Sequence, residues 1–314
     1  HQFYPIDNLF LTNKFLKFWK PCMAVFVDSE IWPCMYNNIN DKKIPLILLN
    51  ARLTRKTFKK WMMLRSFARS IFNKITITYP QNLETAQYLK ILRANNIRHL
   101  GNLKFAENFE ENLDRININL KKELKKKKIW VASSTHKNEE VFCAKAHIEL
   151  KKKVKNLITI IIPRHIHRSE EIILDIKNLG LKVSQHSAKP RSLKDTDIYI
   201  VDTFGETKKF HKIGSSVFLG GSIIDRGGQN PLEAARFGAK ILHGPNTDNF
   251  KDVYKLLKLL NVSKKILTPK KLASSITFRK NKIIGNKIKD IGQNILKKTI
   301  KELDYFIIDE FKKT

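Results

Sequence analysis

Residues 129–162 read IWVASSTHKNEEVFCAKAHIELKKKVKNLITIII, and the pattern of apolar residues in this segment indicates the fold class. Its two ends, IWVAS (129–133) and LITIII (157–162), are short apolar runs typical of strands that are buried on both faces. Between them, residues 138–154 carry apolar side chains at helical spacing. A strand, a helix and a second strand in this order predict a parallel β-α-β unit, so we expect an α/β protein.

The same alternation continues toward the C-terminus. Strands are expected at LKVSQ (181–185), DIYIVD (197–202), SVFLGG (216–221) and KILHGP (240–245). Helices are expected at residues 170–178, 206–211, 231–238 and 249–260, and the tail from residue 269 reads as mostly helical. This pattern predicts a doubly wound parallel sheet, so residues 121–314 are expected to form a Rossmann-like domain with the C-terminal helices attached.

Residues 1–120 repeat the pattern less completely. MAVFVD (23–28), IPLILLN (44–50) and KITITY (74–79) read as strands, residues 57–73 and 83–95 as helices, and IRHLG (97–101) as a last short strand. We expect a smaller Rossmann-like domain that is truncated at its start, because the strands are few and the chain begins at His1 rather than at methionine. The polar, charged residues 104–128 are interpreted as the linker.

Composition restricts the function classes. Of 314 residues, 42% are hydrophobic, which is too many for a disordered chain, and no apolar run approaches the ~18 residues of a membrane span. Three cysteines without a C-x-x-C pair favour a reducing compartment. With 60 Lys and Arg against 29 Asp and Glu, the net charge of +31 indicates an anionic partner or a composition bias across the surface.

Candidate site residues follow the predicted strands, because ligands bind beyond the carboxyl ends of strands in open parallel sheets. Ser134, Thr135 and His136 follow the strand at 129–133 and are possible contacts for a phosphate or carboxylate, or an ordinary helix cap. Pro163 and Arg164 follow the next strand, where a guanidinium offers a planar fork for phosphate or forms a surface ion pair.

Two further strand ends carry candidates. Phe204, Gly205 and Glu206 follow residues 197–202, and the glycine permits close backbone approach to a ligand. The most informative segment is GGQNPLEAARFG (227–238), in which a double glycine precedes the start of a helix. A capping box explains part of this segment, whereas a phosphate cradle explains the flanking glycines as well. The residues concerned are Asn230, Pro231, Leu232 and Glu233.

In the first half, Glu30, Arg52 and Lys104 each follow a predicted strand. They either face the same crevice from the other domain or are three unrelated surface charges. His165 and His167 lie two residues apart, but no carboxylate or cysteine completes a recognisable set of metal ligands, so we expect no metal site.

These motifs, in this order, resemble the 3-deoxy-D-manno-octulosonic acid (Kdo) transferases, which are GT-B glycosyltransferases of lipid A assembly. The resemblance runs through most of the chain: SEIWP (29–33), NARLT (50–54), GNLKF (101–105), WVASSTH (130–136), PRH (163–165), DTFGE (202–206), FLGGS (218–222), GGQNPLEAARFG (227–238) and GPNTDNF (244–250).

The resemblance implies a GT-B fold of two Rossmann-like domains and an inverting transfer without metal or cofactor. The donor would be CMP-Kdo and the acceptor the tetraacyl disaccharide precursor of lipid A (lipid IVA), at the cytoplasmic face of the bacterial inner membrane. Glu30 and Lys104 match catalytic positions that stabilise the transition state, and Arg52 is a possible donor contact. CMP binding carries over to Pro163, Arg164, Phe204, Gly205, Glu206, Asn230, Pro231, Leu232 and Glu233.

The chain departs from the family at its start. The family's catalytic base, a glutamate in a Gly-rich segment, and an N-terminal membrane anchor both lie upstream of anything here, and neither Asp7 nor Asp28 matches that motif. We therefore expect a fragment that binds CMP without transferring Kdo. Residues 57–69 mix basic and large apolar side chains, as either an interfacial helix or a helix packed on the first sheet would.

Two other functions stay open on the sequence. One is another GT-B transferase, or a sugar-nucleotide epimerase, that uses a UDP-sugar. The other is a basic nucleic-acid-binding protein, although the sequence shows no recognisable nucleic-acid-binding motif and its lysines are scattered through both halves, so we expect no nucleic-acid partner.

Overall fold

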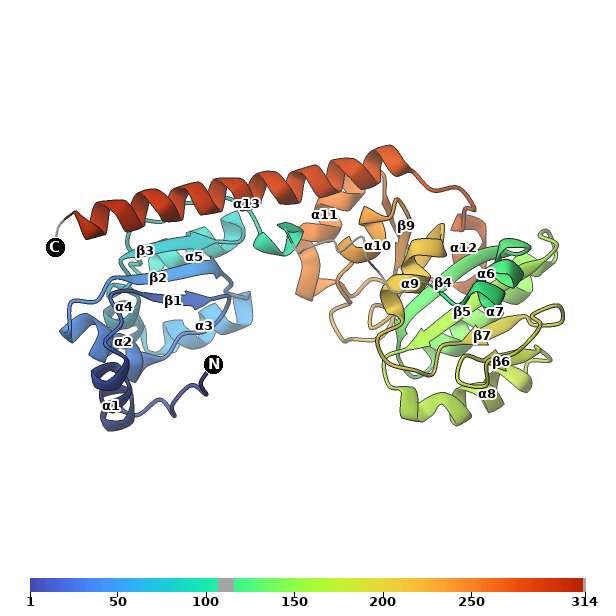
Figure 1. Ribbon diagram of the computed structural model, residues 1–314, viewed down its shortest axis with the longest axis horizontal. Helices are drawn as coiled ribbons and strands as arrows, with labels where there is room; N and C mark the ends of the chain where they lie inside the picture. Colours follow the sequence, from blue (N-terminus) through green and yellow to red (C-terminus); the bar gives the residue numbers. More distant parts are fainter. Residues whose placement is uncertain (107–115, 313–314) are drawn as a thin grey trace. The chain divides into compact units, whose positions relative to one another are not determined.

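The computed structural model describes residues 1–106 and 116–312. The chain divides into two compact units, of which unit 1 is His1–Glu107 with Ile291–Thr314 and unit 2 is Asn108–Asp290 (Figure 1). Residues 116–120, which we assigned to the first domain, therefore belong to unit 2, and residues 291–312, which we assigned to the second domain, pack with the first. The physical reason is that Leu303 and Phe306 cover apolar side chains on one face of the first sheet.

Unit 1 is built on a parallel sheet with the strand order β1-β2-β3. The strands are β1 (Ala24–Val27), β2 (Leu46–Ala51) and β3 (Ile77–Pro80), and the 3-10 turn η1 (Leu103–Ala106) follows them. The helices are α1 (Leu9–Trp19), α2 (Pro33–Asp41), α3 (Arg55–Met63), α4 (Arg65–Phe72), α5 (Leu83–Ile91) and the end of α13 (Lys282–Phe311).

The central strand β2 buries both faces, as a parallel strand between helices must. Leu46 and Leu48 join the cluster that α1, α2, α4 and α5 form, whereas Ile47 and Leu49 pack on the opposite face with Leu303 of α13. The alternation along this strand thus fixes which helices cover which face.

Local differences from the sequence prediction have identifiable causes. The helix expected at 57–73 is two helices, α3 and α4, because Leu64 (φ −117°, ψ 56°) leaves the helical conformation. The strand expected at 97–101 is reduced to a single bridge between Ile97 and Thr78. Helix α1 was not predicted; Asn8 caps it by accepting from the amides of Phe10 and Leu11.

Unit 2 contains a seven-stranded parallel sheet with the order β10-β9-β8-β4-β5-β7-β6. Its strands are β4 (Lys128–Thr135), β5 (Leu157–Pro163), β6 (Val183–Gln185), β7 (Ile198–Ile200), β8 (Ser216–Leu219), β9 (Lys240–His243) and β10 (Ser263–Lys265). Its helices are α6 (Ile118–Lys125), α7 (Glu139–Lys151), α8 (Ser169–Lys177), α9 (Thr207–Ile213), α10 (Leu232–Arg236), α11 (Lys251–Leu259), α12 (Pro269–Ser275) and the start of α13, with 3-10 turns η2 (Ile166–Arg168) and η3 (Asp248–Phe250).

The predicted α/β class with parallel sheets is confirmed, and of these strands only β10 was not predicted. β4 pairs with β5 on one side and with β8 on the other, so the strand order reverses between β4 and β8. This reversal is the topological switch point at which α/β sheets open a crevice beyond their carboxyl ends. Buried Trp130, Ile161 and Phe218 from the three strands share one core cluster, which holds the switch point rigid.

Candidate functional site

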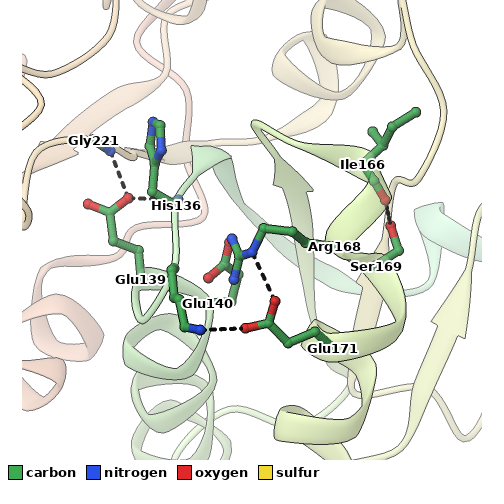
Figure 2. Close-up of polar contacts among 9 residues, drawn as sticks. His136, Glu139, Glu140, Ile166, Arg168, Ser169, Glu171 and Gly221 are labelled. Atoms are coloured by element: carbon green, nitrogen blue, oxygen red, sulfur yellow. Dashed lines mark hydrogen bonds and ion pairs between the residues drawn. The ribbon is translucent and has the colours of Figure 1, made fainter.

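A buried carboxylate occupies the switch point. Glu139, at the start of α7, is fully buried, and its two oxygens accept four backbone amides (Figure 2). Oε2 accepts from His136 (3.0 Å) and Gly221 (2.7 Å), and Oε1 accepts from Ser222 (3.1 Å) and Ile223 (2.9 Å). The amides that an incoming phosphate would otherwise use at this point are therefore occupied by the protein's own anion.

Ser134 and Thr135, which we expected after the strand, are the last two residues of β4, and only His136 follows it. Thr135 is buried, and Ser134 adopts a left-handed backbone conformation (φ 54°). His136 has a buried Nε2 without a hydrogen-bond partner among the described residues. Burial lowers the pKa of His136; Glu139 opposes this effect, and His165, Arg226 and Arg164 add to it. The lowered pKa favours the neutral form of His136 beside the guanidinium groups of Arg164 and Arg226.

Arg164 follows β5 directly, and its backbone amide donates to the carbonyl of Thr135 (2.9 Å). This hydrogen bond continues the β4–β5 ladder and keeps Arg164 next to the end of β4. Its guanidinium is exposed and has no ion pair within the part of the chain that the structure describes. Pro163, by contrast, is buried as the last residue of β5. The end of β5 thus presents an unpaired cation.

The segment after β7 presents an aromatic ring and a carboxylate. Phe204 is 81% exposed, and Gly205 adopts φ +81°, a conformation that side-chain-bearing residues rarely adopt. Glu206 is held by Lys209 (Nζ–Oε1, 3.0 Å) and lies 3.9 Å from Nε2 of His186. Burial lowers the pKa of His186, although Glu206 and Asp202 oppose that shift.

The predicted capping box forms only in part. Asn230 accepts from the amide of Leu232 (3.1 Å), as a cap should. Glu233 instead lies against α9, with Oε2 3.0 Å from Nδ1 of buried His211 and Oε1 3.8 Å from Nζ of Lys208. Burial raises the pKa of Glu233, but the nearby imidazole of His211 and the charge of Lys208 outweigh it, so the pKa is lowered overall.

Close backbone packing explains two of the glycines. A Cβ on Gly220 would lie 2.3 Å from the carbonyl oxygen of Ser134 and 2.7 Å from Oε2 of Glu139. Gly228 adopts φ +72° and donates its amide to the carbonyl of Gly221 (2.8 Å). The two glycine turns are therefore joined to each other.

The first-half candidates lie in unit 1. Nζ of Lys104 in η1 lies 2.9 Å from Oδ2 of Asp28, which follows β1. Asp28 also accepts the amide of Arg52 through its carbonyl (3.0 Å). Glu30 is exposed, and its Oε2 accepts from the indole of Trp32 (2.8 Å). The structure thus brings the ends of β1 and β2 together with η1.

Asp7 has a structural contact in unit 1: it caps α2 by accepting from the amides of Cys34 (3.1 Å) and Met35 (2.9 Å). Among residues 1–106 and 116–312, no cluster of three or more His, Cys, Asp or Glu side chains is arranged to hold a metal ion. Within the same residues no helix has both the length and the apolar character needed to cross a bilayer.

Sequence reasoning gave no role to three residues that organise these sites: Asp28, Glu139 and His211. Three of the four amides that Glu139 accepts, those of Gly221–Ile223, lie more than eighty residues away in the sequence. The available signal was the position of Glu139 at the start of a helix, where backbone amides lack intrahelical acceptors.

Comparisons with known proteins agree with the motifs. The family described as 3-deoxy-D-manno-octulosonic-acid transferase (kdotransferase) matches residues 1–107. The transferase of that name from Rickettsia prowazekii is 34% identical over 99% of this chain and 67% of its own length. The one from Rickettsia bellii is 32% identical over 99% of this chain and 73% of its own length. The chain thus spans about two thirds of the length of these relatives.

A solved structure of a UDP-N-acetylglucosamine 2-epimerase shares the fold, with a TM-score of 0.54 at 12% identity over 95% of this chain and 76% of that one. At this identity the likeness shows the fold alone. Together with the extent of the sequence matches, the order of the motifs decides the family. The chain belongs to the 3-deoxy-D-manno-octulosonic acid transferase family of glycosyltransferases.

Proposed function

We propose that unit 2 binds CMP-Kdo and that the chain serves the transfer of Kdo to the tetraacyl disaccharide precursor of lipid A in lipopolysaccharide biosynthesis. Family membership supports the reaction. The observation that carries the proposed donor site is the set of strand ends: an unpaired arginine follows β5, and oriented carboxylates follow β7 and β8.

Arg164 is the proposed partner of the CMP phosphate. Its exposed guanidinium stands at the end of β5, and a planar fork matches phosphate oxygens in pairs. The start of α10, with Asn230, Pro231 and Leu232, follows β8 in the same parallel sheet. As the sugar bond to phosphate breaks, a cation at this place stabilises the leaving CMP.

The nucleoside is assigned to the carboxylates and the exposed ring. His211 and Lys208 hold Glu233 ionised, so it can accept from ribose hydroxyls. Glu206 is similarly oriented by Lys209. Phe204 offers an exposed aromatic face beside Gly205, on which a base can stack.

Glu30 and Lys104 are the proposed catalytic residues of unit 1. Lys104 can neutralise charge that develops as the donor bond breaks, and its pair with Asp28 holds the ammonium at the end of β1. Glu30, oriented by Trp32, can stabilise a positively charged sugar centre. The proposed reaction inverts the anomeric centre and needs no metal, so the rate in EDTA should equal the rate without it.

An anionic membrane surface is the proposed location of the acceptor. Helices α3 and α4 expose Met63 (82%), Leu64 (65%) and Phe67 (46%) among lysines and arginines. On the other side, Phe58 stacks on Tyr88 and joins the unit 1 core. The helix pair therefore packs on the sheet and still presents an apolar, basic face, the combination that binds anionic interfaces.

Transfer itself tests this function. The chain would be incubated with CMP-Kdo, with and without the tetraacyl acceptor, and both CMP release and the mass of the glycolipid would be followed. Acceptor-dependent CMP release with a product heavier by Kdo supports the proposed reaction and overturns the expectation that this chain binds CMP without transferring Kdo. Saturable binding of CMP-Kdo without turnover supports the proposed donor site together with that expectation. Turnover of a UDP-sugar with none of CMP-Kdo would contradict it.

A further inference from the structure

Glu139 joins three segments around the proposed donor site: the end of β4, the start of α7 and the turn after β8. Hydrogen bonds link that turn to the segment that is proposed to bind CMP. The carboxylate accepts the amide of Gly221, and the carbonyl of Gly221 accepts the amide of Gly228 (2.8 Å). Two residues further on, Asn230 begins the segment that carries Glu233. The position of the second glycine turn is thus set through the first.

The same carboxylate also fixes the other side of the crevice. It accepts the amide of His136 (3.0 Å), at the end of β4 (Figure 2). His136 and the turn after β8 are therefore held by the two lone pairs of one oxygen, Oε2. A Cβ built on Gly221 would lie 3.3 Å from Nε2 of His136, so the imidazole packs directly against this turn.

We propose that Glu139 is a positioning residue for donor binding: through the amides of His136 and Gly221–Ile223 it sets the spacing between the end of β4 and the glycine turns that carry the CMP-binding segment. The inference rests on the proposed function of unit 2. Glu139 does not touch the donor itself, because its four acceptor positions are filled by amides.

Replacement by glutamine tests the inference with almost no change in shape. Each oxygen of Glu139 accepts two N–H groups, so in Glu139→Gln the new NH2 group must face two donors whichever way the amide is turned. One pair of amides then loses its acceptor: either those of His136 and Gly221, or those of Ser222 and Ile223.

The adjacent Glu140 provides a matched control. It is equally buried (2% exposed against 0%), but its carboxylate pairs with the guanidinium of Arg168 (3.1 Å) and not with the turn after β8. If the loss of a buried charge acts only by lowering stability, Glu139→Gln and Glu140→Gln should change CMP affinity to the same extent. If Glu139 has a positioning role, Glu139→Gln should lower CMP affinity and Glu140→Gln should not.

The experiment measures three quantities on the parent chain and both variants: the melting temperature, the calorimetric affinity for CMP well below it, and hydrogen exchange of the amides of residues 221–228. We expect Glu139→Gln to lower the affinity about tenfold and to speed exchange in that segment, and Glu140→Gln to stay within about twofold of the parent in both. Glu139→Asp, which keeps the charge but withdraws it by one methylene, replaces Glu139→Gln if that variant does not fold.

The outcomes are separable. If folded Glu139→Gln binds CMP within about twofold of the parent, the positioning role is wrong and Glu139 serves stability alone. The same conclusion follows if both variants lose affinity equally. If the parent chain itself does not bind CMP, the proposed donor fails first, and this role of Glu139 fails with it.

Discussion

Buried His211 lies against partly exposed Glu233 in unit 2, with Nδ1 of the imidazole 3.0 Å from Oε2 of the carboxylate. The side chain of Glu233 is 23% exposed, and its Oε1 lies 3.8 Å from Nζ of Lys208. The contact joins α10 to α9 and leaves the carboxylate accessible to solvent. A glutamate held in this way suits an acceptor of ribose hydroxyls.

This arrangement predicts a selective effect of removing the carboxylate. Glu233→Gln should weaken CMP binding by about tenfold, since a hydrogen bond to a charged group contributes ~1.5–3 kcal/mol. The loss should be smaller for deoxy-CMP, which lacks one ribose hydroxyl. Calorimetric titration with both nucleotides measures the difference. Glu170→Gln, at an exposed glutamate of α8, is the control; equal losses for both nucleotides would contradict the ribose assignment.

Arg164 should supply the part of the CMP affinity that depends on the phosphate group. Arg164→Ala is expected to lower CMP affinity by about tenfold to a hundredfold and cytidine affinity hardly at all, because cytidine lacks the phosphate. Arg191→Ala removes another exposed arginine of unit 2 and should leave both affinities unchanged. An Arg164→Ala variant that binds CMP like the parent would exclude Arg164 as the phosphate ligand.

The basic face of α3 predicts binding to anionic vesicles. Reversing Lys59 and Lys60 to glutamate should reduce sedimentation with phosphatidylglycerol vesicles by more than about tenfold, since each basic residue near such a surface contributes ~1 kcal/mol. The matched control is Lys297→Glu with Lys298→Glu on exposed positions of α13, which changes the net charge equally. If both double variants lose binding to the same extent, the attraction is a property of net charge and not of α3.

Acid should destabilise the chain through His147. This side chain is fully buried with Nδ1 2.8 Å from Oγ1 of Thr159, and burial lowers its pKa to about 4, against the opposing charge of Asp197. Between pH 6.5 and about 4 the unfolded chain binds a proton that the native chain does not, so the free energy of unfolding falls as pH falls, by up to about 3 kcal/mol.

Denaturant unfolding at several pH values between 7.5 and 4.5 measures this slope. His147→Gln has no titrating group at this position and should show a shallower dependence than the parent, whereas His99→Gln, at an exposed histidine, should keep the parent's slope. Parallel curves for the parent and His147→Gln would show that His147 is not the group responsible.

Much of unit 2 was predictable because its strands are continuous apolar runs bounded by clear helix signals. The run at 157–162 becomes β5, and Arg164 follows it as expected. The segment at 231–238 was harder: α10 covers only Leu232–Arg236, because Gly238 adopts φ +76° and ends it. Local sequence patterns therefore predicted which helices and strands form more accurately than where each of them ends.

The contacts that organise the sites were beyond such patterns, because they join residues far apart in sequence. The carboxylate of Glu139 accepts the amides of Gly221–Ile223 across the switch point, and the ammonium group of Lys104 pairs with Asp28 within unit 1. The C-terminal tail was predicted as helical, but nothing in its own periodicity indicates that Leu303 and Phe306 cover the first sheet. These contacts depend on which strands are neighbours in each sheet. The order of the elements along the chain does not by itself give that arrangement.

If unit 2 is a cytidine nucleotide site, calorimetric titration of the chain should distinguish CMP from UMP. We expect saturable binding of CMP and much weaker binding of UMP, with circular dichroism of the same sample showing a folded α/β protein. A folded chain that binds UMP as well as CMP, or neither, would contradict the assignment and favour a UDP-sugar or another ligand.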